Sequence, residues 1–152
     1  MGLLATTAGA SNASVTFYQA QAKHSGLCMR VITSGDVNVN RTVQRSCDDS
    51  PSNHFALQPS DDGHYRLVVQ GSGKCLAVEN GSVSDRAYIA QTSCTSNWSQ
   101  QWAVTPADDG YYELKNRKSQ KCMDVQGDYV YPGAIIWQFG CDGGDNQKFA
   151  FN

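Results

Sequence analysis

The sequence has few charged residues, no strongly basic region and no long apolar run. Only 17% of its 152 residues are charged, and the net charge is −2. Binding to the phosphate backbone of a nucleic acid requires a basic surface, so we expect no nucleic-acid partner. A membrane-spanning helix needs about 18 consecutive apolar residues. The sequence contains no such stretch, so no membrane span is predicted.

The first residues lack the basic start and the apolar centre of a secretory signal peptide. They are mostly small and polar. We interpret residues 1–14 as a linker, a processed remnant or a cloning remnant. Residues 15–152 are predicted to form a single domain, which agrees with the length of the chain.

Patterns typical of metal sites and hydrolases are also missing. No two cysteines have the C-x(2–4)-C spacing of a zinc site, and the three histidines match no ligand pattern. A glycosidase needs two carboxylates at a defined separation, and a catalytic triad needs a histidine beside its nucleophile. Asp48-Asp49 and Asp61-Asp62 lie in turn-like segments, and no histidine neighbours a candidate nucleophile. We therefore expect no metal, no cofactor and no enzymatic activity.

What the sequence does contain is a repeat with a period of 47 residues. Two cysteine series follow this period, and the two cysteines of each repeat lie 19 positions apart. The same period is followed by Tyr18, Tyr65 and Tyr112; Val31, Val78 and Val125; Gln44, Gln91 and Gln138; and Phe55, Trp102 and Phe149. A fixed period of this length indicates one supersecondary unit used three times. The repeats run over about 12–58, 59–105 and 106–152.

The repeat symmetry predicts three disulfide bonds, one inside each repeat. The pairs are Cys28–Cys47, Cys75–Cys94 and Cys122–Cys141. In the chain-entropy model each bond stabilises the fold by roughly 3 kcal/mol. Disulfides persist outside the reducing cytosol, so we expect a secreted, extracellular or periplasmic protein.

Within each repeat, short β-like runs alternate with turn signals, and no run keeps the 3.6-residue period of a helix. Pro59-Ser-Asp-Asp-Gly63 and Pro106-Ala-Asp-Asp-Gly110 mark equivalent turns between repeats. The pattern predicts four short strands per repeat and about twelve in all. An all-β trefoil with pseudo-threefold symmetry fits three units, whereas a propeller normally needs at least four blades.

The columns repeated in all three units are interpreted as structural. We expect the tyrosine, valine and Phe/Trp columns to form a shared core. The glutamine column is expected to bond the backbone of a long loop, because it persists in repeats whose other features differ.

The third repeat reads CMDVQGDYVYPGAIIWQFGCDGGDNQKFAF, and the second ends with Gln100-Gln101-Trp102. These repeats resemble those of the ricin-B-type β-trefoil lectins, also described as family-13 carbohydrate-binding modules, which combine C-x-D-V, paired cysteines and Q-x-W. The resemblance covers residues 15–152. It implies carbohydrate binding.

The resemblance also implies which residues contact a sugar. In these lectins an acidic residue two positions after the first cysteine accepts hydrogen bonds from sugar hydroxyls, here Asp124. An aromatic residue two positions before the second cysteine stacks on the pyranose, here Phe139. Asn146 and Gln147 match the amides near the Q-x-W element. A carboxylate makes charge-assisted hydrogen bonds, and an aromatic face covers the C–H patch of a sugar ring.

Three further aromatic residues of this repeat are candidates for the same site. Trp137 lies two residues before Phe139, so both point to the same face of a strand, where Trp137 widens or blocks the pocket. Tyr129 and Tyr131, in the preceding loop, are candidates for an aromatic rim. In the structural alternative, Asp124 only satisfies local backbone donors and Asn146 only caps a turn.

The first two repeats depart from the lectin pattern. Their acidic, aromatic and amide positions hold Arg30, Arg45 and Ser52 in the first repeat, and Ala77, Thr92 and Ser99 in the second. We expect neither to bind sugar in the manner of the family. Trp98 has no aromatic equivalent and is either part of a contact surface or a cover over the core.

The leading hypothesis is a non-catalytic domain that binds glycans through one main site in the third repeat. Galactose-, N-acetylgalactosamine- or xylan-type glycans are the expected ligands. The domain would act as a targeting module of a larger secreted enzyme or toxin. The alternative is a β-trefoil protein-interaction domain that has lost sugar binding, which the altered pockets and Trp98 favour.

Overall fold

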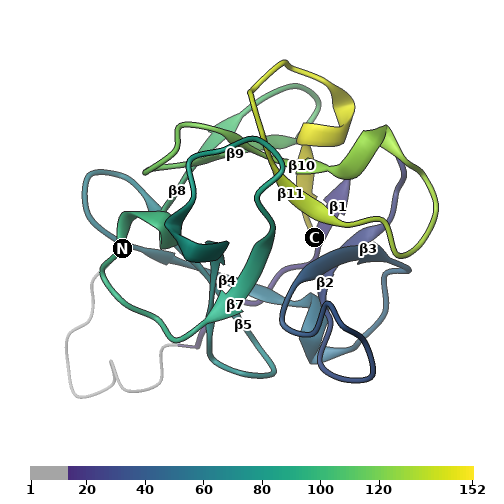
Figure 1. Ribbon diagram of the computed structural model, residues 1–152, viewed down its shortest axis with the longest axis horizontal. Coiled ribbons are helices and arrows are strands. Elements are labelled where there is room, and N and C mark those ends of the chain that lie inside the picture. The colour runs from purple at the N-terminus through teal and green to yellow at the C-terminus, as the bar shows by residue number, and fades with distance from the viewer. Residues whose placement is uncertain (1–13) are drawn as a thin grey trace.

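Six strands, two from each repeat, form a barrel in the computed structural model, which describes residues 14–152. The interpretation of residues 1–14 therefore falls almost wholly outside the described part. The barrel strands are β1 (Ala20–Ala22), β4 (Phe55–Pro59), β5 (Tyr65–Val69), β8 (Trp102–Pro106), β9 (Tyr112–Asn116) and β12 (Phe149–Phe151). In Figure 1 the repeats follow one another around the centre of the molecule.

The long antiparallel pairs of the barrel cross from one repeat to the next. Strand β4 pairs with β5, and β8 with β9, through the two predicted Asp-Asp-Gly turns. In the first of these turns Asp62 and Gly63 have φ values of 55° and 75°, which glycine adopts without strain. The barrel closes where β1 pairs with β12 and where Tyr18 and Phe55 exchange two backbone hydrogen bonds of 2.8 Å.

Each repeat adds a hairpin outside the barrel, and short 3₁₀ helices follow several strands. The hairpins are β2 (Cys28–Val31) with β3 (Thr42–Arg45), β6 (Cys75–Val78) with β7 (Ile89–Thr92), and β10 (Cys122–Val125) with β11 (Ile136–Phe139). The 3₁₀ helices are η2 (Pro51–Asn53), η3 (Glu79–Gly81), η4 (Trp98–Gln100), η5 (Gln126–Asp128) and η6 (Asp145–Gln147). Single bridges link the three hairpins to one another. Twelve strands in three equal units confirm the predicted trefoil.

The core confirms two of the three predicted columns. Phe55, Trp102 and Phe149 are fully buried, and so are the valines of the second column. The indole N–H of Trp102 donates to the carbonyl of Leu76 at 3.1 Å, so its polar atom is satisfied.

The tyrosine column does not belong to the core, and that expectation was wrong. These tyrosines are half-buried, whereas the residues two positions later, Ala20, Leu67 and Leu114, are fully buried. A tyrosine at the start of a barrel strand keeps its hydroxyl near water, while the next residue on the same face reaches the interior.

All three predicted disulfides are present, each joining the hairpin of a repeat to the segment that leaves it. They connect Cys28–Cys47, Cys75–Cys94 and Cys122–Cys141. The paired Cα atoms lie 5.0 Å apart in every case. The bonds fix the ends of each hairpin.

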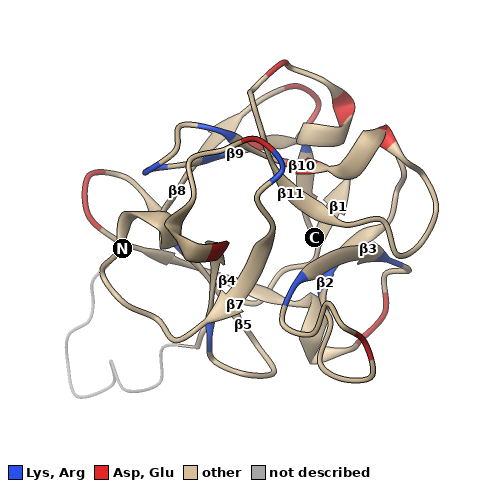
Figure 2. Cartoon of the chain, in the orientation of Figure 1, with Lys and Arg blue, Asp and Glu red and all other residues tan. Residues whose placement is uncertain are grey.

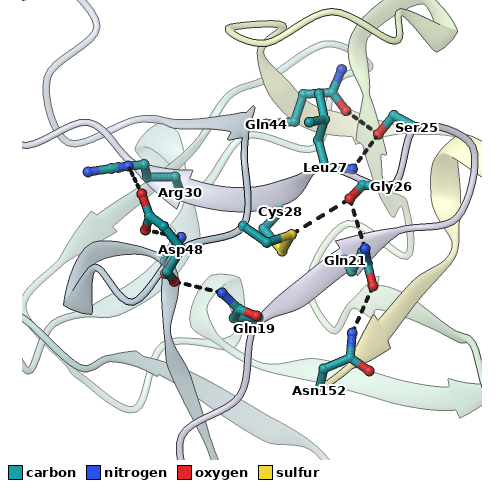
Figure 3. The surroundings of a disulfide bond; sticks show 12 residues. Gln19, Gln21, Ser25, Gly26, Leu27, Cys28, Arg30, Gln44, Asp48 and Asn152 are labelled. Carbon is teal, nitrogen blue, oxygen red and sulfur yellow. Dashed lines mark hydrogen bonds and ion pairs between the residues drawn. A yellow bond between two sulfur atoms is a disulfide. The ribbon is translucent and has the colours of Figure 1, made fainter.

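The repeated glutamines hold neighbouring repeats together. The hydroxyl of Ser25 donates to Gln44 Oε1 at 2.8 Å, as Figure 3 shows. Gln44 Nε2 in turn donates to the carbonyls of Tyr129 and Tyr131 at 2.8 and 2.9 Å. The predicted loop-bonding role is confirmed, but the loop belongs to another repeat.

The other two glutamines also reach a neighbouring repeat, Gln138 by bonds to loop backbone and Gln91 by a bond to a side chain. Gln138 Nε2 donates to the carbonyls of Ser82 and Ser84 at 3.1 and 2.8 Å, reaching from the third repeat to the second. Gln91 Nε2 donates to the side chain of Asn40 at 3.0 Å, reaching from the second repeat to the first. We call this set the glutamine clasp.

Charged residues of both signs are scattered over the molecule, as Figure 2 shows. Within the described residues, the longest helices are short 3₁₀ turns, and none has the length and apolar character needed to cross a membrane.

Candidate functional site

The third-repeat hairpin places Asp124 directly opposite Trp137 across the β10–β11 pair. Side chains alternate along each strand, so Trp137 and Phe139 share the outer face while Ile136 and Gln138 point inward. Burial follows this alternation, because Ile136 and Gln138 are fully buried and the two aromatic residues are half-buried. The predicted common face is confirmed.

Three side chains donate hydrogen bonds to the carboxylate of Asp124. Trp137 Nε1 donates to Oδ1 at 2.8 Å, and the amides of Gln147 and Asn146 donate to Oδ2 at 2.9 and 3.1 Å. Asp124 is 4% exposed, and no ion pair to it is found within residues 14–152. All these donors are side chains, so Asp124 does more than satisfy local backbone donors.

The position of Gln147 depends on two further bonds. Its Oε1 accepts from the backbone N–H of Asp142 at 2.9 Å, and its Nε2 also donates to the carbonyl of Gly140 at 3.0 Å. Asn146 additionally donates to the carbonyl of Val125 at 3.0 Å. The two amides are thereby held in place before any ligand arrives.

Burial raises the pKa of Asp124 above its ordinary value of 3.8. Hydrogen bonds from Gln147 and Trp137 act in the opposite direction, because they favour the charged form. When Asp124 is ionised, the hydrogen bonds to its carboxylate within residues 14–152 come from neutral side chains.

These residues line an open hollow of about 550 Å³, which we call the third-repeat hollow. Its wall consists of Arg86, Asp124, Gln126, Gly127, Asp128, Tyr129, Trp137, Phe139, Asp142, Gly144 and Asn146. Of the predicted site residues, Asp124, Trp137, Phe139 and Asn146 line this hollow. Gln147 is 1% exposed and acts behind Asp124.

Tyr131 does not line the third-repeat hollow. It is 51% exposed and stacks on Tyr129, with ring centroids 4.9 Å apart. Tyr129 does line the hollow, and its ring packs over Gly127, where a Cβ atom would lie 2.9 Å from the ring. The aromatic rim is thus Tyr129, with Tyr131 behind it.

A residue of the second repeat completes the wall of the third-repeat hollow. The guanidinium of Arg86 lies over the Phe139 ring, 5.5 Å from its centroid. Arg86 is held there because its backbone N–H donates to the carbonyl of Gln138 at 2.7 Å, and Asp85 accepts from the N–H of Gly140 at 3.0 Å. Sequence reasoning missed Arg86, because its position in the second repeat shows no match to the lectin pattern.

The equivalent place in the first repeat is occupied by an arginine. Arg30, at the position of Asp124, pairs with Asp48 at 3.2 Å and donates to the hydroxyl of Ser50 at 3.3 Å. Figure 3 shows Arg30 extended toward Asp48 beside the first disulfide. The position that holds the carboxylate in the third repeat is thus occupied here by a cation in an ion pair.

The second repeat keeps a hollow but changes its lining. This second-repeat hollow measures about 730 Å³. It is lined by Ala77, Val78, Asn80, Gly81, Thr92, Ser93, Thr95, Asn97, Trp98, Ser99, Gln100 and Lys118. Ala77 and Thr92 stand where the third repeat has Asp124 and Phe139, so carboxylate and stacking ring are both absent from those positions.

Trp98 lines the second-repeat hollow and rests on a buried arginine. The guanidinium carbon of Arg117 lies 4.0 Å from the centroid of the indole ring. Arg117 is held by Asp61 and Asp62 at 2.8 and 2.7 Å and by Gln101 Oε1 at 2.7 Å. Its side chain is 9% exposed, whereas Trp98 is 53% exposed. Trp98 is therefore a supported surface residue and does not cover the core.

Comparison with known proteins identifies the family. The family described as "Ricin-type beta-trefoil lectin domain-like" matches residues 6–92, 59–139 and 98–152. A comparison with curated proteins by sequence gives no match.

Solved structures give the same answer. The designed threefold-symmetric protein ThreeFoil is 36% identical, with a TM-score of 0.82, over 89% of this chain and 96% of that chain. The exo-beta-1,3-galactanase 1,3Gal43A from Clostridium thermocellum is 29% identical, with a TM-score of 0.84, over 91% of this chain and 30% of that chain. The hemolytic lectin CEL-III is 25% identical, with a TM-score of 0.75, over 90% and 30%. The chain belongs to the ricin-type β-trefoil lectin-like family, and this membership supports carbohydrate binding in general.

Proposed function

We propose that the domain binds a neutral pyranoside in the third-repeat hollow and acts without catalysis. The observation that carries this proposal is the carboxylate of Asp124, which is buried, has no ion pair within residues 14–152 and is held by three side-chain donors at the edge of an open hollow. Burying a charge in this way is costly unless it is needed. A structural role alone would be met more cheaply by a neutral side chain.

In this proposal each residue has a separate task. Asp124 accepts hydrogen bonds from sugar hydroxyls on its free lone pairs. Asn146, whose two amide N–H groups already donate to Asp124 and to Val125, offers its Oδ1 as a further acceptor for these hydroxyls. Phe139 stacks on the apolar face of the ring. Trp137 and Gln147 are positioning residues, because each donates to Asp124 and orients its carboxylate.

A neutral ligand fits the charges of the hollow. Three carboxylates line it, from Asp124, Asp128 and Asp142, against the single cation of Arg86. An anionic sugar would meet repulsion there. Among the galactose-, N-acetylgalactosamine- and xylan-type ligands, the similarity to a protein named an exo-beta-1,3-galactanase favours the galactose type.

We further propose that the domain is a targeting module of a larger secreted enzyme or toxin. The chain spans only 30% of the galactanase and 30% of the hemolytic lectin to which it is similar. Three disulfides and membership of a lectin-like family favour an extracellular location. One shallow site binds a simple sugar with a dissociation constant on the order of 1 mM, so tethering to a partner domain would add avidity.

A glycan array containing galactosides, N-acetylated sugars and xylo-oligosaccharides tests the proposal. We expect a focused set of neutral glycans to bind the disulfide-intact domain, and Asp124→Ala to lose them while remaining folded. Ala77→Ser, at the same position of the second repeat, is the matched control and should bind as the unmodified domain does. A blank array from a folded sample, or binding indifferent to Asp124→Ala, would favour the alternative of a protein-binding trefoil.

A further inference from the structure

The second-repeat hollow has the features of a binding site with a chemistry of its own. It is the larger of the two hollows, and an aromatic platform enters it from η4 instead of from the hairpin. We propose that the second-repeat hollow binds a pyranoside carrying an anionic substituent, a carboxylate or a sulfate, through Trp98 and Lys118.

Trp98 supplies the stacking surface. One face of the indole is covered by Arg117, and the ring nevertheless remains about half exposed along the hollow. Arg117 is fixed by two aspartates and a glutamine, so the indole is held without needing a ligand. A rigid aromatic face binds the C–H patch of a sugar ring at little entropic cost.

Lys118 supplies the charge. Its Nζ lies against Gly81 in the wall of the hollow, where a Cβ atom would be 2.7 Å away. No carboxylate within residues 14–152 pairs with Lys118. Glu79, which lies in the same 3₁₀ helix η3 as Gly81, is paired with Arg41 at 2.7 and 3.0 Å. Lys118 is therefore a cation available to an anionic ligand.

The remaining wall is neutral. No aspartate or glutamate lines the hollow, and Ala77 removes the carboxylate that the third repeat has at this place. Both ends of the Gln100 amide are already bonded, to the N–H of Thr95 at 2.7 Å and the carbonyl of Ser93 at 2.9 Å. The hydroxyl of Thr92 and the amides of Asn80 and Asn97 line the space and can meet sugar hydroxyls. Ala77 therefore has two effects: it removes the acceptor that a neutral sugar would need, and it removes the negative charge that would repel an anionic sugar.

The three tryptophans allow each hollow to be tested separately. Trp98 lies in the second-repeat hollow, Trp137 in the third-repeat hollow, and Trp102 in the core as an internal control. Their indole N–H signals are followed by NMR during titration with methyl β-glucuronide and with methyl β-glucoside. Concentrations up to about 50 mM exceed the dissociation constant of a single shallow site. Galactose 6-sulfate against galactose forms a second pair, which distinguishes sulfate from carboxylate.

We expect the Trp98 signal to move with an anionic sugar at about one tenth of the concentration needed for its neutral parent, because the contact with Lys118 is charge-assisted. Lys118→Gln should abolish this preference. Lys74→Gln, a change of an exposed lysine of the second repeat that does not line the hollow, should preserve it. Trp98→Ala tests the platform and should weaken anionic-sugar binding measured by calorimetry.

The proposal is overturned if neither anionic sugar moves the Trp98 signal ahead of its neutral parent, or if the preference survives Lys118→Gln. Movement of the Trp137 signal alone by the anionic sugars would also overturn it, because the ligand would then lie in the third repeat. Failure of the neutral site would be seen independently, as an unmoved Trp137 signal with neutral galactosides.

Discussion

The second- and third-repeat hollows occupy equivalent positions of one scaffold, yet they offer opposite chemistry. The third has a buried carboxylate, two further carboxylates at its rim and a stacking ring on the hairpin. The second has an alanine in place of the buried carboxylate, a lysine with no ion pair among residues 14–152, and a stacking ring on the 3₁₀ helix. The backbone places a hollow in both repeats, and a few side chains decide what each one binds.

The difference also has an energetic side. Hydrogen bonds from Trp137, Asn146 and Gln147 offset the cost of burying the Asp124 carboxylate. Of these three donors, the second repeat has an equivalent only of Gln147, which is Gln100. A carboxylate and its donors therefore form one unit, which is retained or lost as a whole.

Removing the carboxylate should give the largest effect on neutral-sugar binding. Asp124→Asn loses a charge-assisted acceptor and turns an amide donor toward Asn146 or Gln147. We expect affinity for a neutral galactoside to fall by about 30-fold or more, equivalent to about 2 kcal/mol. Titration followed at the Trp137 indole signal measures this. Unchanged affinity in a folded variant would remove Asp124 from the site.

Placing the carboxylate in the other repeat should reduce stability. Ala77→Asp buries a charge that lacks the donors provided by Trp137 and Asn146, because Ala90 and Ser99 stand at those positions. We expect the free energy of unfolding to decrease by about 2 kcal/mol in urea denaturation at pH 7. Adding Ala90→Trp and Ser99→Asn should recover part of the loss. A neutral effect of Ala77→Asp alone would show that the donors are dispensable.

Removing the stacking ring should have a smaller effect. Phe139→Ala is expected to weaken neutral-galactoside binding by about fivefold, since stacking on an aromatic face contributes roughly 1 kcal/mol. Thr92→Ala is the matched change in the second repeat and should leave that affinity unaltered. Calorimetry of both variants distinguishes the two hollows, and equal losses would contradict the assignment.

The smallest effect is expected from pH. Burial raises the pKa of Asp124 above 3.8, so the carboxylate is lost at a higher pH than that of an exposed aspartate. Neutral-galactoside affinity should fall by about twofold when the pH reaches this raised pKa and further below it. Asp124→Asn should lack this dependence.

The same shift has a defined sign for stability. Between pH 3.8 and the raised pKa the folded chain holds the Asp124 proton more tightly than the unfolded chain. The contribution of Asp124 to the free energy of unfolding therefore decreases as pH rises through this window. Comparing urea denaturation of the unmodified domain with that of Asp124→Asn isolates this contribution. A difference that stayed constant across the window would contradict it.

Much of the fold follows from the sequence, because the 47-residue period and the cysteine pairs are visible without coordinates. The meeting of Asp124, Phe139 and Asn146 was also predictable, since their positions relative to the cysteines match a known pattern. The half-buried position of the tyrosine column was not predictable, because the repeat period alone does not distinguish a residue at the barrel edge from one in the interior.

Contacts between repeats could not be predicted from the sequence either, because the repeat period does not show which segments pack together. Arg86 reaches Phe139, and Arg117 supports Trp98, through packing between segments that share no sequence pattern. The donor role of Trp137 toward Asp124 depends on the hairpin register, which the sequence does not specify until both strand ends are known. The position of Tyr131 behind Tyr129 follows from the path of their loop, whose carbonyls accept hydrogen bonds from Gln44.

Because of the glutamine clasp, the functional unit is not the 47-residue repeat seen in the sequence. It is the loop of one repeat together with the hairpin of the next. Each clasp ties the loop of one repeat to the hairpin of the next, and Arg86 reaches the third-repeat hollow by that route. Duplicating or exchanging a single 47-residue segment would separate Arg86 from Phe139 and leave both parts without their partner. Ligand preferences of neighbouring repeats are therefore expected to change in pairs during divergence, with a loop mutation in one repeat altering the sugar accepted by the next.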